Sequence, residues 1–179
     1  MTMNRFALFL GAVTAPILAS AQGGQAGPAG ARAQAPTPDY SLTIRAIPAE
    51  AKAGTAINLS IAWKNLSDRS FRVAQEYKNP KRVDEAYRTY VRDEKGNLAP
   101  ETAWGREIRT GKSEGPPTLQ TGAAYRYDLE PGEVFTQSIL LNRLYDLSQP
   151  GKYTVQVEHL DPQTKLAVKS NVIELSVTK

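Results

Sequence analysis

The sequence has no cysteine and a single histidine among its 179 residues. No disulfide can therefore staple the fold, and no thiolate is available as a nucleophile or a metal ligand. One imidazole cannot supply both histidines of a His-x-x-x-His zinc site. Charge of one sign is also scarce, because 22 Lys and Arg against 18 Asp and Glu give a net charge of +4. This excess does not indicate a nucleic-acid partner, and we expect no cofactor.

The first 21 residues have the pattern of an export signal. A positive start that includes Arg5 precedes the apolar run Phe6–Leu18, and Ala19-Ser20-Ala21 supplies the small residues of a cleavage site. The run is shorter than the roughly 20 residues that a membrane-spanning helix needs. We predict a signal peptide over residues 1–21, a location in the periplasm or outside the cell, and a mature chain that does not span the membrane.

Residues 22–39 are predicted to form a disordered linker. Alanine, glycine and proline dominate this stretch, and such a composition cannot bury enough apolar surface to offset the entropy of ordering the chain. The folded part is expected over residues 40–179, a length that suits one domain.

From Tyr40 onward, hydrophobic residues recur with the period of a β-strand. The clearest case is 57–63, where Ile57, Leu59, Ile61 and Trp63 alternate with small or polar residues. Residues 81–90 also fit a helix, but the surrounding strands favour a strand that ends at the turn 94–97. Residues 98–121 show no period and are predicted to be a long loop, either functional or packed on the domain.

The most specific local pattern is structural. Leu147 and a Pro-Gly turn ending at Gly151 precede Tyr153, which opens a strand of alternating valines. This is the arrangement of a tyrosine corner, in which the tyrosine hydroxyl bonds back to the main chain. We therefore predict an all-β fold, an antiparallel immunoglobulin-like β-sandwich of about 7–8 strands, with Trp63 as a candidate core aromatic.

The chain resembles immunoglobulin-like and fibronectin-III-like modules of secreted bacterial proteins. The pattern Leu129-x-Pro131-Gly132-Glu133, with the corner around Tyr153, is also similar to the β-domain attached to some secreted zinc peptidases of the deuterolysin type. A weaker similarity is to small β-sandwich proteinase inhibitors. These resemblances imply a fold rather than an activity, because sandwiches carry many functions. The peptidase motif His-Glu-x-x-His is missing from the sequence.

No enzyme is predicted. The sequence has no Gly-x-Ser-x-Gly nucleophile motif. The adjacent acids at 84–85 and 93–94 are interpreted as solvated turn charges. His159 shares a strand face with Val155 and Val157, and we interpret it as an ordinary strand-end histidine rather than a metal ligand.

Four residues are candidates for a ligand site. Trp104 and Arg106 lie in the predicted long loop, and Tyr125 and Tyr127 share one face of a strand. Exposed aromatic rings of this kind can stack on a sugar. Burial of Trp104 under a loop that folds over the sandwich is an equally good interpretation.

A second candidate surface is basic. Residues 69–92 carry seven Lys and Arg against three Asp and Glu, and strand parity places Arg88 and Arg92 on one face with Tyr90. Such a patch can bind an anionic surface or a polysaccharide. The alternative is a solvated sheet face whose long side chains cover the rings beneath.

The sequence as a whole predicts a secreted, non-catalytic module with a protein-binding, cell-surface-binding or structural role. A carbohydrate-binding module is the alternative, and a proteinase inhibitor is a weaker one. The expected partner is a protein or a component of the cell envelope, with a glycan as the alternative and nucleic acid excluded.

Overall fold

The computed structural model describes residues 37–77, 80–112, 123–161 and 164–179 of the chain. The predicted signal peptide and most of the predicted linker lie outside these ranges, as do residues 113–121 of the predicted loop. All described residues belong to one unit, Pro36–Lys179. None of their helices has the length and apolar character needed to cross a membrane.

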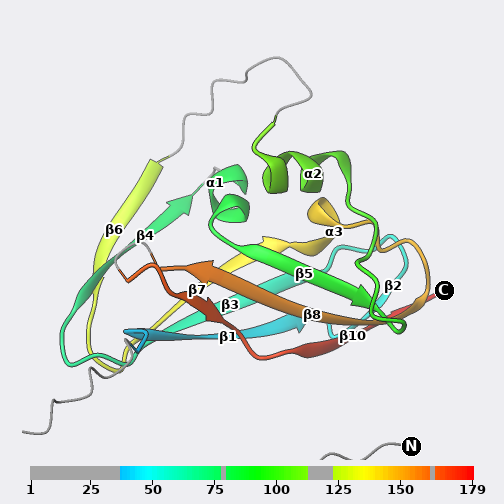
Figure 1. Cartoon of the computed structure of the whole chain (residues 1–179). Helices are drawn as coiled ribbons and strands as arrows, with labels where there is room; N and C mark the ends of the chain where they lie inside the picture. Colours follow the sequence, from blue (N-terminus) through cyan, green and yellow to red (C-terminus); the bar gives the residue numbers. More distant parts are fainter. Residues whose placement is uncertain (1–36, 78–79, 113–122, 162–163) are drawn as a thin grey trace, which may run out of the picture. The chain divides into compact units, whose positions relative to one another are not determined.

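Strands dominate the described residues, and three short helices interrupt them (Figure 1). The elements in chain order are β1 (Tyr40–Ile47), β2 (Glu50–Lys52), β3 (Asn58–Asn65), β4 (Phe71–Tyr77), α1 (Pro80–Glu85), β5 (Arg88–Asp93), α2 (Ala103–Thr110), β6 (Ala123–Leu129), β7 (Val134–Leu140), α3 (Leu141–Leu144), β8 (Gly151–Leu160), β9 (Ala167–Lys169) and β10 (Ile173–Thr178). The short strands β2 and β9 have three residues each. The remaining strands match the number predicted.

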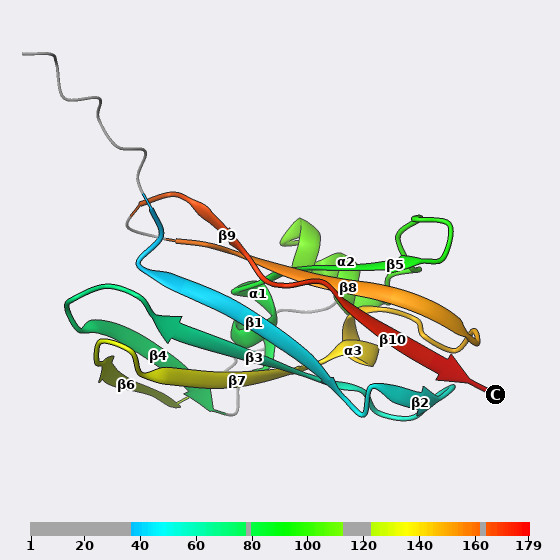
Figure 2. The same cartoon turned by 90° about the horizontal axis from the view of Figure 1, so that it is seen from below.

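Two sheets form the layers of a sandwich (Figure 2). One has the strand order β1-β3-β7, and the other has the order β2-β10-β8-β5, with β9 paired to β8. All pairings in these sheets are antiparallel except that of β2 with β10. This order is that of an immunoglobulin-like sandwich, so the predicted fold class is confirmed.

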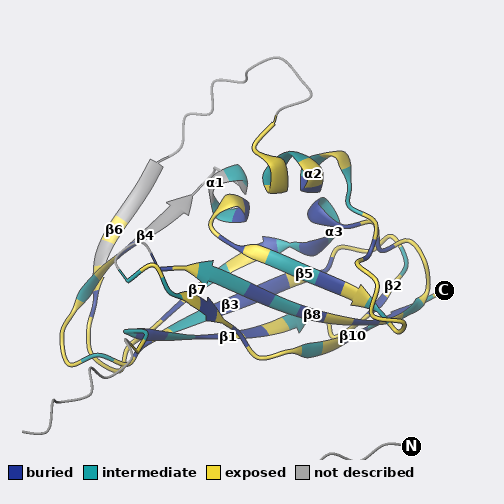
Figure 3. Ribbon diagram, viewed as in Figure 1, coloured by how far each residue is buried: buried dark blue, intermediate teal, exposed yellow. Residues whose placement is uncertain are grey.

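The core lies between the sheets and follows the alternation seen in the sequence (Figure 3). In β3, Leu59 and Ile61 are buried, and in β8 Val155 and Val157 are buried. Successive residues of a strand point to opposite faces, so every second residue reaches the interior. Trp63 continues the inward row of β3 and packs against this core.

The tyrosine corner is present at the start of β8. The Tyr153 hydroxyl donates to the main-chain oxygen of Gln149 at 2.8 Å, and Leu147 is buried beside it. A Cβ at Gly151 would lie at an ordinary 3.9 Å from the Tyr153 ring. Space around Gly151 therefore does not require glycine.

A buried amide holds the bend where the β3–β7 pair continues into the separate β4–β6 pair. Asn65 is 1% exposed, and its Nδ2 donates to the main-chain oxygens of Arg69 (2.8 Å) and Leu129 (2.9 Å). Its Oδ1 accepts from the main-chain N–H and the hydroxyl of Ser67. One side chain thus satisfies main-chain groups from both connections.

The edge of the sandwich formed by β1 is closed by the segment between β9 and β10; we call this the β1 edge. Leu42 forms a parallel bridge with Ser170. The Asn171 side chain accepts from the Ile44 N–H at 2.7 Å and donates to the Ile44 carbonyl at 3.2 Å. A side-chain amide therefore takes the place of a pairing strand beside Ile44.

Three sequence predictions need correction. Residues 80–85 form α1 ahead of β5, so the helical and strand interpretations of 81–90 each describe one part of it. Residues 103–110 of the predicted loop form α2. Asp84 is fully buried rather than a solvated turn charge.

Candidate functional site

Three short helices close the other edge of the sandwich, beside β5 (Figure 1); we call this the helical edge. Their common anchor is the buried carboxylate of Asp84 in α1. It accepts from Arg143 of α3, with Nε at 2.7 Å and Nη2 at 2.8 Å, and from the indole N–H of Trp104 in α2 at 2.8 Å. A buried carboxylate needs such partners, because an unpaired polar group in the interior is strongly destabilising. The three contacts tie all three helices to one residue.

Helix α2 has clear end signals and one position where only glycine fits. The Thr102 hydroxyl accepts from the Gly105 N–H at 3.0 Å at the N-terminus, and Gly111 ends the helix in the left-handed region with φ 67°. A Cβ at Gly105 would overlap the carbonyl oxygen of Leu144. Gly105 therefore allows α2 to lie directly against the end of α3.

A cleft of about 420 Å³ lies between α2 and the edge of β5. Its lining comes from α1 and β5, the connection to α2, α2 itself and the end of α3. These residues are Glu85, Tyr87, Arg88, Thr89, Tyr90, Leu98, Glu101, Gly105, Ile108, Arg109, Leu144 and Tyr145. Binding sites for small molecules in proteins occupy roughly 300–1,000 Å³ and are lined in this mixed manner.

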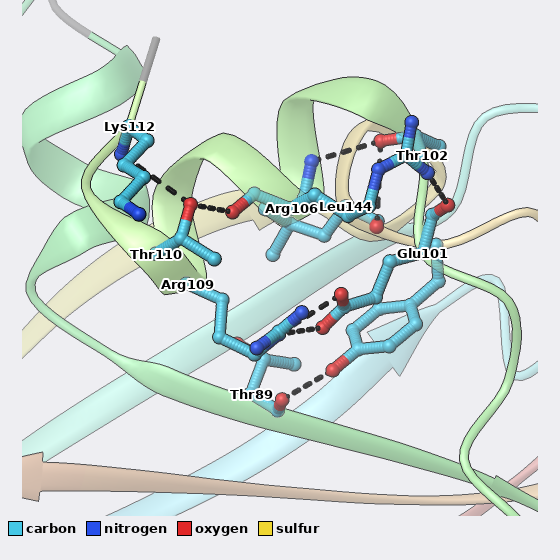
Figure 4. A network of polar contacts seen from close by, with 10 residues as sticks. Thr89, Glu101, Thr102, Arg106, Arg109, Thr110, Lys112 and Leu144 are labelled. Atoms are coloured by element: carbon cyan, nitrogen blue, oxygen red, sulfur yellow. Dashed lines mark hydrogen bonds and ion pairs between the residues drawn. The ribbon is translucent and has the colours of Figure 1, made fainter. Parts of the chain in front are cut away.

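Polar contacts fix two walls of the cleft (Figure 4). The Arg109 Nε donates to both carboxylate oxygens of Glu101, at 2.8 and 2.9 Å. The Tyr145 hydroxyl donates to the Thr89 carbonyl at 2.5 Å. Burial, and then the nearby Glu101 carboxylate, raise the pKa of Tyr145 to about 12. Tyr145 therefore keeps its proton at neutral pH and acts only as a hydrogen-bonding group.

The hydroxyl of Thr89 is buried and has no hydrogen-bond partner among the described residues. The main-chain carbonyl of Thr89 accepts a hydrogen bond from the Tyr145 hydroxyl, whereas the side-chain Oγ1 forms none within the described residues. Buried polar groups in proteins are nearly always paired, and an unpaired one calls for an explanation. Thr89 is one of the residues that line the cleft, so the residue that carries this hydroxyl borders the open volume.

The predicted basic pair lies on the outer face of β5, next to this cleft. Arg88 and Arg92 are both exposed and flank Tyr90, as strand parity predicts. Arg88 lies 3.7 Å from Glu158, and Arg92 donates to the Gly96 carbonyl at 2.8 Å. Arg88 also lines the cleft, whereas Arg92 lines a separate groove of about 220 Å³.

The four residues predicted as a ligand site are not assembled into one by the described part of the chain. Trp104 is partly buried in α2, packs against the core and uses its indole N–H on Asp84. Arg106 is exposed and donates to the Glu101 carbonyl at 2.9 Å. Tyr125 and Tyr127 belong to β6, where they lie opposite Gln75 and Val73 of β4. The structure describes the main chain at these two positions but not their side chains.

His159 lies in an aromatic cluster near the start of β1. Its Nδ1 is 2.6 Å from the Tyr40 hydroxyl, and its ring centre is 4.5 Å from that of Trp63. The Trp63 indole N–H donates to the Tyr87 hydroxyl at 2.7 Å. Burial lowers the pKa of His159, and Asp161 acts in the opposite direction. The imidazole is thus a packed, hydrogen-bonded member of the interior.

The described residues give no evidence of a metal centre. Within the described ranges, no group of three or more His, Asp or Glu side chains is placed to hold a metal ion. The carboxylates of Asp84 and Glu101 are each bonded to a guanidinium.

Sequence reasoning missed the cleft, although one signal for it was present. Thr102 and Gly111 bracket eight residues in the way that a capping residue and a terminal glycine bracket a helix. Gly105 within the helix obscured this pattern, because glycine is a poor helix former. Nothing in the sequence indicates that Thr89 lines the same cleft as residues of α2.

No known protein family and no curated protein matches this sequence. Among solved structures, the chain is similar to a CARDB domain from Pyrococcus furiosus crystallised with a pair of metal ions, at 14% identity and a TM-score of 0.41, over 78% of this chain and 93% of that one. It is also similar to a β-glucosidase from Erythrobacter marinus, at 13% identity and a TM-score of 0.38, over 78% of this chain and 15% of the enzyme. A third similarity, at 12% identity and a TM-score of 0.38, is to the alkylpurine DNA glycosylase AlkC of Pseudomonas fluorescens, over 79% of this chain and 31% of that one. Similarity at this level transfers no ligand and no activity to this chain.

Proposed function

We propose that this chain is an exported, non-catalytic binding module that holds a protein or cell-envelope component at the cleft between α2 and β5. The observation that carries the proposal is the cleft itself, about 420 Å³ in volume and lined by tyrosine, aliphatic and charged side chains. A concave site with a few convergent polar groups is the usual form of a binding site. The start of the sequence, with its pattern of an export signal, supports the cell envelope as the place of action.

The absence of a catalytic role is part of the proposal and rests on how the reactive groups are used. His159 is packed among aromatic rings and bonded to Tyr40. Glu101 in the cleft is held through both oxygens by Arg109. A general acid or base must be free to exchange a proton with a substrate, and neither group is arranged in that way.

Site-specific photocrosslinking in the native host tests the site. A benzophenone amino acid is placed at Leu98, which lies on the rim of the cleft and is 51% exposed. The matched control carries it at Arg45, which is exposed on β1 of the other sheet. We expect an envelope component to be crosslinked from Leu98 and not from Arg45. No adduct from Leu98, or the same adducts from both positions, would overturn the proposal.

Cell fractionation tests the export part of the proposal separately. We expect the protein outside the cytoplasm, with a mature N-terminus at Gln22 when it is sequenced by Edman degradation or mass spectrometry. Retention of the full-length chain in the cytoplasm contradicts export but leaves the crosslinking result to stand on its own.

A further inference from the structure

The walls of the cleft combine rings and aliphatic side chains in a way that suits a ligand with an apolar body. Tyr90 contributes a partly exposed ring, and Leu98 and Ile108 contribute aliphatic side chains. Tyr87 and Tyr145 also line the cleft, but they are buried, at 3% and 6% exposed. Tyrosine offers an apolar ring face and a polar tip in one side chain. A ligand with apolar faces and polar edges matches such walls on both counts.

The charges at the cleft cancel. Glu85 and Glu101 supply two carboxylates, and Arg88 and Arg109 supply two guanidinium groups. Arg109 and Glu101 are already bonded to each other. A balanced set of charges does not attract a ligand of either sign, so the field in the cleft favours an uncharged ligand.

The buried hydroxyl of Thr89 adds a demand for hydrogen bonding. A hydroxyl both donates and accepts, and within the described residues nothing in the chain does either with this one. Charged side chains at the rim, such as Glu85 and Arg88, add planar groups that can bond pairs of neighbouring hydroxyls. An uncharged ligand that meets these groups must carry several hydroxyl or amide groups.

We propose that the cleft binds a short neutral saccharide, with the Thr89 hydroxyl as a hydrogen-bonding group at its floor. Sugar rings have apolar faces for Tyr90, Leu98 and Ile108 and hydroxyl edges for Thr89 and the rim. This inference rests on the proposed function and names the ligand class of the same cleft. It places the site at β5 and α2, and assigns no role in it to Trp104.

Calorimetric titration tests the proposal with neutral di- to tetrasaccharides of glucose, galactose, mannose and N-acetylglucosamine. An oligogalacturonate of the same length serves as the anionic probe. We expect the full chain to bind at least one neutral saccharide and to bind the anionic probe more weakly. No response to any neutral saccharide, or stronger binding of the anionic probe, would overturn the proposal.

Thr89→Val separates binding from folding. The change removes the hydroxyl and keeps the shape, so the thermal midpoint should stay unchanged or rise while saccharide affinity falls roughly three- to tenfold. Thr89→Ser should restore the affinity, and Thr43→Val, on the exposed face of β1, should leave it unchanged. If Thr89→Val does not fold, Tyr90→Ala provides the same affinity test from the partly exposed rim. Full affinity in both Thr89→Val and Tyr90→Ala would overturn the site.

The result also separates this inference from the proposed function. A protein crosslinked from Leu98, together with no saccharide response, would overturn the saccharide and leave the binding module standing. Release of free reducing ends from a bound saccharide would overturn the non-catalytic role and leave the ligand class standing.

Discussion

The two edges of this sandwich are closed by different means. At the β1 edge, Asn171 and Ser170 bond directly to the main chain of β1, so the two sheets meet without an intervening element. At the helical edge, three short helices stand between the sheets, joined through the buried carboxylate of Asp84. The cleft of about 420 Å³ lies at the helical edge.

This difference shows why an open volume lies at one edge and not at the other. Hydrogen bonds to the main chain close an edge tightly, because segments paired in this way lie only about 4.8 Å apart. Packed helices keep a larger spacing, since their axes lie about 8–10 Å apart. The helical edge can therefore hold a cleft, beside which the Thr89 hydroxyl has no partner among the described residues. Such a group costs stability.

The largest effect is expected from removing the anchor of the helical edge. Asp84→Ala leaves Arg143, which is partly buried, without its carboxylate, and we expect a loss of about 3–5 kcal/mol in the free energy of unfolding. Denaturant titration measures this loss. The matched control is Asp128→Ala, which breaks an exposed ion pair with Arg72 and should leave the midpoint unchanged. A loss at Asp84 no larger than in the control would show that the helices do not depend on this residue.

A smaller loss is expected at the β1 edge. Asn171→Ala leaves the N–H and the carbonyl of Ile44 without their partners, at a cost of about 1–3 kcal/mol. Hydrogen exchange should speed up at Ile44 and stay unchanged in α2. In the double variant with Asp84→Ala the two losses should add, because the sites share no partner. Strong non-additivity would mean that the two edges are one cooperative structure.

The tyrosine corner serves as a reference for both edges, since Tyr153 lies on β8 between them. Tyr153→Phe removes the bond to Gln149 and should cost about 1 kcal/mol. The midpoint should fall while exchange at Ile44 and in α2 changes to the same extent. An unchanged midpoint would mean that the corner adds nothing to stability.

The smallest effect is a pH dependence of the aromatic cluster around His159, which joins Tyr40 of β1 to Tyr87 of the cleft. Burial lowers the pKa of His159 below the 6.5 of a free histidine, so the unfolded chain binds a proton more readily as the pH falls. The stabilising effect of the neutral side chain is complete above about pH 6.5 and is lost as the pH falls toward the folded pKa. His159→Gln should flatten this part of the stability curve, measured by urea titration from about pH 7.5 to 5. Equal slopes in variant and parent would contradict the assignment.

Alternation and one corner motif were enough to predict the fold. The spacing of Val155 and Val157 predicts a buried strand, and the corner motif around Tyr153 predicts where it starts. The helical edge was not predicted, because the residues that hold its helices together are far apart in the sequence. The carboxylate of Asp84 meets Trp104 and Arg143 only after the chain has folded. In the sequence, the neighbouring acids Asp84 and Glu85 cannot be told from a pair of solvated turn charges. The unpaired state of the Thr89 hydroxyl likewise depends on neighbours that the sequence does not reveal.

Asn171 has a consequence for how copies of this protein meet one another. An exposed strand edge is a template on which a second chain can add a strand, and many proteins guard such edges against aggregation. Beside Ile44, both pairing groups of β1 are already occupied by one amide. Asn171 leaves no free pairing group at Ile44 for a strand of another molecule. Its loss should therefore lower solubility at high concentration more than its modest contribution to folding suggests.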